Sequence, residues 1–113
     1  MKIWVDDVRP APEGYIWCKS VNEAKLEIKG QENIFEELLN YNSLLVAGKN
    51  PITLIDIDHD AGDYANDGGD YIRILDWLEE TGRNYPIRIH SQNPVGVQNM
   101  RRIIEKNRWK EIV

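Results

Sequence analysis

Carboxylates and histidines gather where three apolar stretches of this chain end, and those groups are capable of chemistry. Asp6 and Asp7 follow residues 3–5, Asp58, His59 and Asp60 follow residues 52–57, and His90 and Ser91 follow residues 86–89. Neighbouring carboxylates repel one another, and a hard cation such as Mg2+ relieves this because it prefers oxygen ligands. Aspartate is also common in turns for structural reasons. A group of aspartates with both histidines of the chain favours a metal or phosphate site.

The two histidines differ in their settings. His59 lies between two aspartates, so it is a candidate general acid, general base or metal ligand, with a solvated loop histidine as the structural alternative. His90 ends an apolar stretch, where a half-buried core histidine is the alternative. Ser91 is expected to hold a phosphoryl oxygen through its hydroxyl, and nothing in the sequence assigns it a base for a nucleophilic role.

A helix start follows the last of these groups. Asn93 and Pro94 have the residue types of an N-cap and a first helical position. The N–H groups of Val95 and Gly96 would then point outward at the positive end of the helix dipole, which is an anion site. Ordinary capping is the structural alternative. A phosphate could then lie between a metal held by the carboxylates and the N–H groups of this helix start.

Hydrophobic spacing and turn residues predict alternating strands and helices. We expect strands at 3–5, 15–19, 52–57 and 86–89, helices at 20–30, 32–46, 70–81 and 93–107, and a small edge strand at 110–113. Ser20 and Glu23 form a capping box, Gly30 is expected to end the first helix, and residues 48–51 (Gly-Lys-Asn-Pro) the second. Such alternation predicts an α/β domain over residues 1–113, with a mostly parallel sheet of four or five strands and helices on both faces.

The position of the polar groups follows from this sheet. In open α/β sheets, ligands bind beyond the carboxyl ends of the strands, so all three groups are expected at one edge. The connection across residues 6–14 is too short for a crossover helix. The second strand is therefore either antiparallel or reached by an irregular loop, and the sequence leaves both open.

Composition limits the classes of partner. The net charge is −5, which argues against an extended nucleic-acid track because such a track needs a basic face. A basic group near the C-terminus is expected to be a solvated helix face; it comprises Arg101, Arg102, Lys106, Arg108 and Lys110. We expect no signal peptide and no membrane span. The single cysteine, Cys18, is expected to be a buried thiol in a cytoplasmic protein.

Two resemblances meet in these residues. An acidic pair after the first strand, Asp58 after the third and Ser91 after the fourth resemble response-regulator receiver domains, although the receiver lysine and first helix have no counterpart. The blocks at 3–10 (IWVDDVRP), 57–63 (IDHDAGD) and 88–96 (RIHSQNPVG) resemble the cyclic-phosphate-processing receiver family more specifically. This resemblance implies a three-layer, flavodoxin-like fold and a metal-dependent enzyme acting on cyclic phosphates of nucleotides or RNA ends.

The resemblance also implies roles for residues. Asp6, Asp7 and Asp58 would hold Mg2+ or Mn2+, and His59, oriented by Asp60, or His90 would move a proton. Arg9 and the amides after Asn93 would stabilise phosphoryl charge.

Two other functions stay open at this point. In the first, Asp58 accepts a phosphoryl group and acts as a switch. In the second, the acidic edge binds a metal or a protein partner without catalysis.

Overall fold

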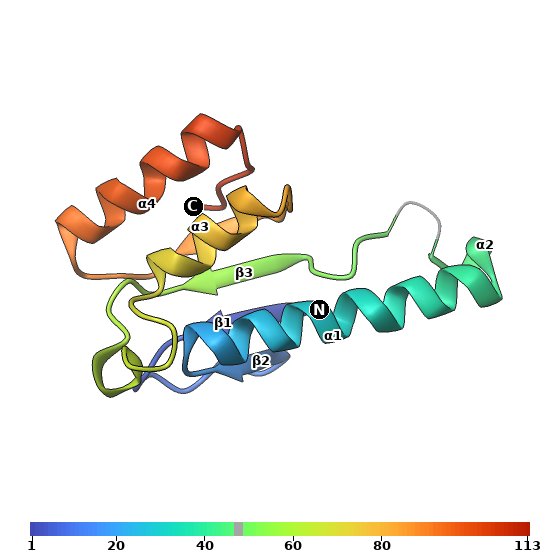
Figure 1. Cartoon of the computed structure of the whole chain (residues 1–113), viewed down its shortest axis with the longest axis horizontal. Coiled ribbons are helices and arrows are strands. Elements are labelled where there is room, and N and C mark those ends of the chain that lie inside the picture. Colours follow the sequence, from blue (N-terminus) through green and yellow to red (C-terminus); the bar gives the residue numbers. More distant parts are fainter. Residues whose placement is uncertain (47–48) are drawn as a thin grey trace.

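A four-stranded parallel sheet organises the chain, in the strand order β2-β1-β3-β4 (Figure 1). The computed structural model describes residues 1–46 and 49–113. The strands are β1 (Lys2–Val5), β2 (Tyr15–Cys18), β3 (Leu54–Ile57) and β4 (Ile87–Ile89). The helices are α1 (Val21–Tyr41), α2 (Ser43–Val46), the 3-10 turn η1 (Gly62–Tyr64), α3 (Ile72–Glu80) and α4 (Pro94–Asn107). The predicted α/β class and the flavodoxin-like strand order are confirmed.

The connection between β1 and β2 resolves the question that the sequence left open. The two strands pair in parallel, with Lys2 opposite Tyr15 and Val5 opposite Cys18. A four-residue strand is only about 13 Å long, so residues 6–14 can return along it as an irregular loop. Two indole N–H groups fix that loop, since Trp4 Nε1 donates to Arg9 O and Trp17 Nε1 donates to Asp6 O, each at 2.8 Å.

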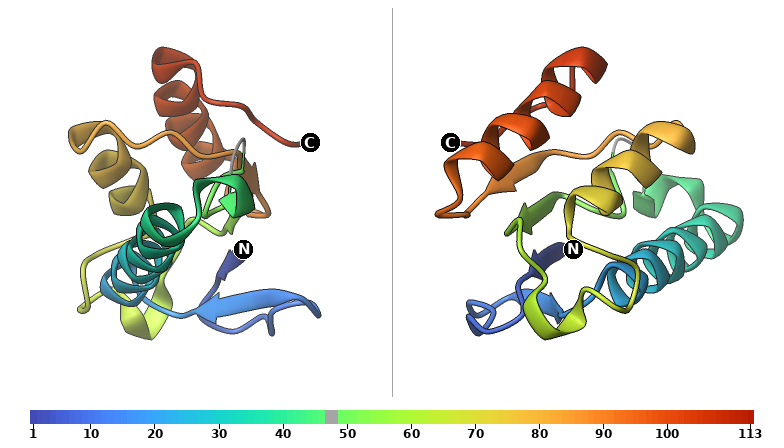
Figure 2. Two further views of the ribbon diagram at one scale, coloured as in Figure 1. Left: turned by 90° about the vertical axis from the view of Figure 1, so that its right-hand side faces the viewer. Right: turned by 60° about the vertical axis from the view of Figure 1, so that its left-hand side comes forward.

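Among the described residues, the helices lie on one face of the sheet instead of the expected two (Figure 2). Alternate strand residues pack with α1, α3 and α4 in a single core; the fully buried ones are Ile3, Val5, Ile55, Ile57 and Ile87. The opposite face carries Trp4, Tyr15 and Trp17, which are only half-buried. The physical reason is the loop at 6–14, where a helix would otherwise cross over that face.

Helix α1 corrects the predicted break at Gly30. One continuous helix runs from Val21 to Tyr41, and only the short α2 follows it. A glycine inside a helix costs about 1 kcal/mol, and the burial of Ala24 and Ile28 against the core offsets that cost. The predicted cap at Ser20 is confirmed, because its side chain accepts from Glu23 N at 3.0 Å. Gly48, the start of the predicted stop at 48–51, lies outside the described residues.

The C-terminal residues extend the sheet by a single bridge. Glu111 forms an isolated parallel bridge with Ile87, and two backbone hydrogen bonds support it, Ile87 N to Lys110 O and Ile112 N to Ile87 O. The predicted edge strand at 110–113 is thus reduced to one bridge. Lys110 pairs with the first residue of β4, at the end of that strand remote from His90.

Candidate metal and phosphate site

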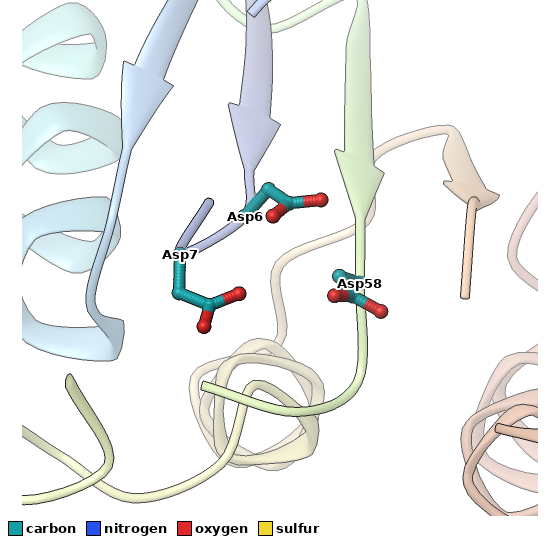
Figure 3. A group of neighbouring side chains, drawn as sticks. All are labelled: Asp6, Asp7 and Asp58. Carbon is teal, nitrogen blue, oxygen red and sulfur yellow. The ribbon is translucent and has the colours of Figure 1, made fainter. Parts of the chain in front are cut away.

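Three carboxylates meet at the carboxyl ends of β1 and β3, as the strand arrangement predicts (Figure 3). One oxygen each of Asp6, Asp7 and Asp58 lies within 4.8 Å of the others. Asp6 and Asp58 are buried and Asp7 is half-buried. The pairing of β1 with β3 causes this, because Val5 is opposite Ile57 and the next residue of each strand is an aspartate.

Asp6 is held in one orientation by several donors. Its Oδ1 accepts from Val8 N at 3.0 Å and from Arg9 N at 2.9 Å. Its Oδ2 lies 2.9 Å from His90 Nε2. Burial pushes the pKa of Asp6 upward, but the backbone N–H groups and the His90 ring outweigh it, so the pKa lies below its ordinary value. Asp6 is therefore an ionised, pre-oriented carboxylate.

The pKa of Asp7 is raised above its ordinary value. Burial raises its pKa, and the charges of Asp6 and Asp58 raise it further, against its own backbone hydrogen bond. Gly62, at the start of η1 with φ of +55°, makes room for this carboxylate, since a Cβ there would overlap Asp7 Oδ2. Sequence reasoning missed Gly62, because its contact with Asp7 depends on how the loop after β3 folds back.

The histidine of the Asp-His-Asp block lies beside the carboxylates and is held from two sides. His59 N donates to Asp58 Oδ1, and its ring Nδ1 lies 2.8 Å from Asp60 Oδ1. The hydrogen bond from His59 is the main reason that the pKa of Asp60 lies below its ordinary value, and Asn93 lowers it further. The structure therefore brings together the predicted pair His59 and Asp60, with Nδ1 engaged.

The start of α4 packs directly against that ring. The predicted N-cap is confirmed, because Asn93 Oδ1 accepts from Gly96 N at 3.0 Å. The N–H of Gly96 is thus engaged by the cap, whereas Val95, at the second helical position, has no acceptor within the helix. A Cβ on Gly96 would lie 2.6 Å from His59 Cδ2 and 2.8 Å from Nδ1. The absence of a Cβ at Gly96 is therefore what lets the start of α4 lie against the His59 ring.

Arg9 and Ser91 border the same edge through backbone contacts. Arg9 Nη1 donates to His90 O at 2.8 Å, and its Nε lies 3.9 Å from Asp6 Oδ2. Its side chain is half-exposed. Ser91 Oγ accepts from Asn93 N at 3.2 Å, so it shapes the turn before α4 while its hydroxyl hydrogen can still be donated.

His90 and Asp56 form a contact that sequence reasoning did not predict. His90 Nδ1 lies 2.7 Å from Asp56 Oδ1, and both nitrogens of its ring are therefore engaged with carboxylates. Asp56 is fully buried. It interrupts the apolar pattern of β3, and this buried charge was the one available signal in the sequence.

Cys18 ends β2 next to Val5, and its side chain is buried in the core. Burial is the main reason that its pKa rises to about 12, and the charges of Glu23 and Glu27 add to it. The expected buried thiol is confirmed.

The donor set suits a hard divalent cation. Three carboxylate oxygens at the ends of two adjacent strands form an oxygen-only site. Burial, together with the negative charges of Asp6 and Asp58, raises the pKa of Asp7. Water can complete the coordination, since Mg2+ keeps several waters when it binds to few carboxylates. Asp6, Asp7 and Asp58 therefore fit such an ion.

Fold and site together define a receiver-like α/β domain with an acidic edge. A protein-family model described as the cyclic-phosphate processing receiver domain matches residues 1–106. The chain belongs to this family, which confirms the resemblance seen in the sequence. No curated protein and no solved structure matched the chain. In the described residues, no helix is both long and apolar enough to cross a membrane.

Proposed function

We propose that the protein is a metal-dependent phosphoesterase that opens cyclic phosphates, with nucleotide or RNA-end 2′,3′-cyclic phosphates as substrates. The observation that carries this proposal is the oxygen cluster of Asp6, Asp7 and Asp58, within 4.8 Å, in a chain of the cyclic-phosphate processing family. The adjacent His59 adds a group that can exchange protons.

The metal would be Mg2+ or Mn2+, held by these three carboxylates. When bound, it supplies Lewis-acid polarisation of a phosphoryl oxygen and lowers the pKa of coordinated water. The chain's own contribution is a fixed cluster, because Asp6 accepts two backbone N–H bonds and Asp58 accepts one.

His59 is the residue to which we assign proton transfer. Its Nδ1 is engaged by Asp60 at 2.8 Å, which fixes the ring and leaves Nε2 for the leaving ribose oxygen. His90 is less suited, since both of its ring nitrogens contact buried carboxylates. Arg9, the hydroxyl of Ser91 and the N–H of Val95 would stabilise charge on the non-bridging phosphoryl oxygens.

The charge distribution supports a small substrate or a strand end. The net charge is −5, and part of the basic group near the C-terminus is neutralised, since Arg101 pairs with Glu111 and Lys106 with Glu79. An extended nucleic-acid track is therefore not proposed. The single buried thiol of Cys18 is compatible with a reducing compartment, and we propose the cytoplasm.

The test is hydrolysis of 2′,3′-cyclic mononucleotides by the wild type and by Asp58→Asn and His59→Ala. Asp58→Asn removes one anionic ligand of the cluster, so turnover should be lost. His59→Ala removes the proposed proton donor, so turnover should fall by about 100- to 10,000-fold. Circular dichroism would verify that both variants fold.

Asp76→Asn is the matched control, because Asp76 is a partly exposed carboxylate on α3 that pairs with Arg73 at 3.6 Å. It should retain wild-type turnover. Full activity of a folded Asp58→Asn variant would contradict the proposal.

A phosphoacceptor switch is the second candidate. It is favoured by the position of Asp58 at the end of β3, beside Asp6 and Asp7. Incubation with acetyl phosphate and Mg2+ should then add one phosphate by intact mass, and an unchanged mass would remove this candidate.

A further inference from the structure

A buried chain of side chains connects the middle of the sheet to the metal cluster. Asp56 of β3 lies on the face opposite the helices, yet it is fully buried. It contacts His90 Nδ1 at 2.7 Å and Arg88 Nη1 at 3.2 Å. The other nitrogen of the His90 ring, Nε2, lies 2.9 Å from Asp6 Oδ2. Asp56, His90 and Asp6 thus form a relay across β3, β4 and β1.

An aromatic ring covers the relay. Trp4 stacks on His90 with ring centroids 3.8 Å apart and an angle of 5° between the planes. Its Nε1 donates to Arg9 O, and Arg9 Nη1 donates to His90 O, each at 2.8 Å. These contacts leave the His90 side chain only 10% exposed. The imidazole ring of His90 is therefore held in one position and cannot rotate freely.

The relay restricts what Asp6 can bind. An ionised carboxylate has about four lone-pair directions. Val8 N, Arg9 N and the His90 ring occupy three of them. The direction that remains is the one available to a cation. His90 is held by Asp56, which does not belong to the cluster. The direction in which Asp6 offers its remaining lone pair therefore depends on Asp56.

We propose that Asp56 and His90 are positioning residues that set the metal affinity of the site by fixing the Asp6 carboxylate. This inference rests on the metal cluster of the proposed function. Groups that hydrogen-bond metal ligands typically change metal affinity by about 10- to 100-fold when mutated. Asp56 holds His90, His90 holds Asp6, and Asp6 offers its remaining lone pair to the ion.

The experiment is a calorimetric titration of the full chain with Mn2+, for the wild type, Asp56→Asn and His90→Gln. Asn keeps the shape of Asp56 but removes the charge that holds the ring. Gln can contact one of the two carboxylates but not both. Each variant should bind Mn2+ about 10- to 100-fold more weakly. The electron paramagnetic resonance spectrum of bound Mn2+ should also change, which a purely structural role would not produce.

Asp76→Asn again serves as the control and should bind Mn2+ as the wild type does. Near-ultraviolet circular dichroism identifies which variants fold, and either folded relay variant suffices for the test. Wild-type affinity and an unchanged spectrum in a folded Asp56→Asn or His90→Gln variant would overturn the positioning role alone. Failure of the wild type to bind Mn2+ would overturn the metal site of the proposed function and this inference with it.

Discussion

At the scale of single residues, two glycines determine how closely the reactive groups approach. Gly62 admits the Asp7 carboxylate and Gly96 admits the His59 ring, each at a place where a Cβ would overlap the side chain. The first approach lets η1 fold back against the carboxylate cluster, and the second lets the start of α4 lie against the His59 ring. Chemistry at this edge therefore depends on residues that have no functional group.

Gly96→Ala tests this dependence. The new Cβ would displace the His59 ring, whose Cδ2 would be 2.6 Å away. A displacement of about 1 Å can cost roughly 100-fold in rate, so we expect kcat on a cyclic nucleotide to fall by about that factor. Steady-state kinetics would measure it.

Gly30→Ala is the matched control for that substitution, since nothing lies within 4 Å of a Cβ at that position of α1. It should leave kcat unchanged and stabilise the protein by about 0.5–1 kcal/mol. Wild-type turnover in Gly96→Ala would show that catalysis does not depend on the observed position of the His59 ring.

Residue types alone predicted the cluster of Asp6, Asp7 and Asp58, because parallel strands must end at one edge. The relay could not be predicted in the same way. Its members lie in or directly after three different strands, and Asp56 meets His90 only because Ile57 is opposite Ile89 in the pairing of β3 with β4. Register is a tertiary property, and a single sequence gives no direct measure of it.

At the scale of elements, α1 shows why local signals misplace boundaries. Gly30 predicts a stop, but the helix continues to Tyr41. Contacts of Glu32 help to hold the middle of this helix. Its carboxylate accepts from Arg83 Nε at 3.2 and 3.0 Å and from Arg83 Nη2 at 2.9 Å. It also accepts from the hydroxyl of Tyr85. Tertiary contacts of this kind override an intrinsic preference of about 1 kcal/mol.

Glu32→Gln should weaken the attachment of α1 to the connection between α3 and β4. Burial raises the pKa of Glu32, but Arg83 and Tyr85 outweigh it, so the folded pKa lies below its ordinary value of 4.5. A lowered carboxyl pKa stabilises the fold above the unfolded pKa and loses this effect as pH falls through the folded pKa. We expect a loss of about 1–2 kcal/mol at pH 7, shrinking below pH 4.5.

Urea unfolding of wild type and variant at pH 7 and at acid pH would measure this difference. Glu36→Gln, at an exposed position one turn further along α1, should change the unfolding free energy by less than about 0.5 kcal/mol. A difference between wild type and Glu32→Gln that did not depend on pH would contradict the assigned ion pair.

At the scale of the whole molecule, the sheet has helices on one face and a half-buried aromatic face on the other. Trp4 links that second face to the site, because it stacks on His90 and bonds to Arg9. The stability of the fold and the order of the carboxylate edge are therefore coupled through the same sheet.

This coupling predicts that adding metal reverses the order of stability of the wild type and Asp58→Asn. Without metal, Asp58→Asn should be more stable than the wild type, since it removes a charge that raises the pKa of Asp7. With Mg2+ at 100 times its Kd, the wild type should gain about 2.7 kcal/mol, or on the order of 10 °C in Tm. The variant should gain almost nothing. Differential scanning calorimetry with Mg2+ or EDTA would measure both, and an equal gain in wild type and variant would contradict a site built on Asp58.

We propose that the edge formed by Asp6, Asp7 and Asp58 opens cyclic phosphates with the help of a divalent metal. The most direct measurement is the hydrolysis rate of a 2′,3′-cyclic mononucleotide as a function of Mg2+ or Mn2+ concentration. We expect no turnover in EDTA, a rate that saturates with metal, and no recovery of Asp58→Asn at any metal concentration. Turnover that persists in EDTA, or no turnover of any cyclic phosphate by a wild type that binds the metal, would contradict it.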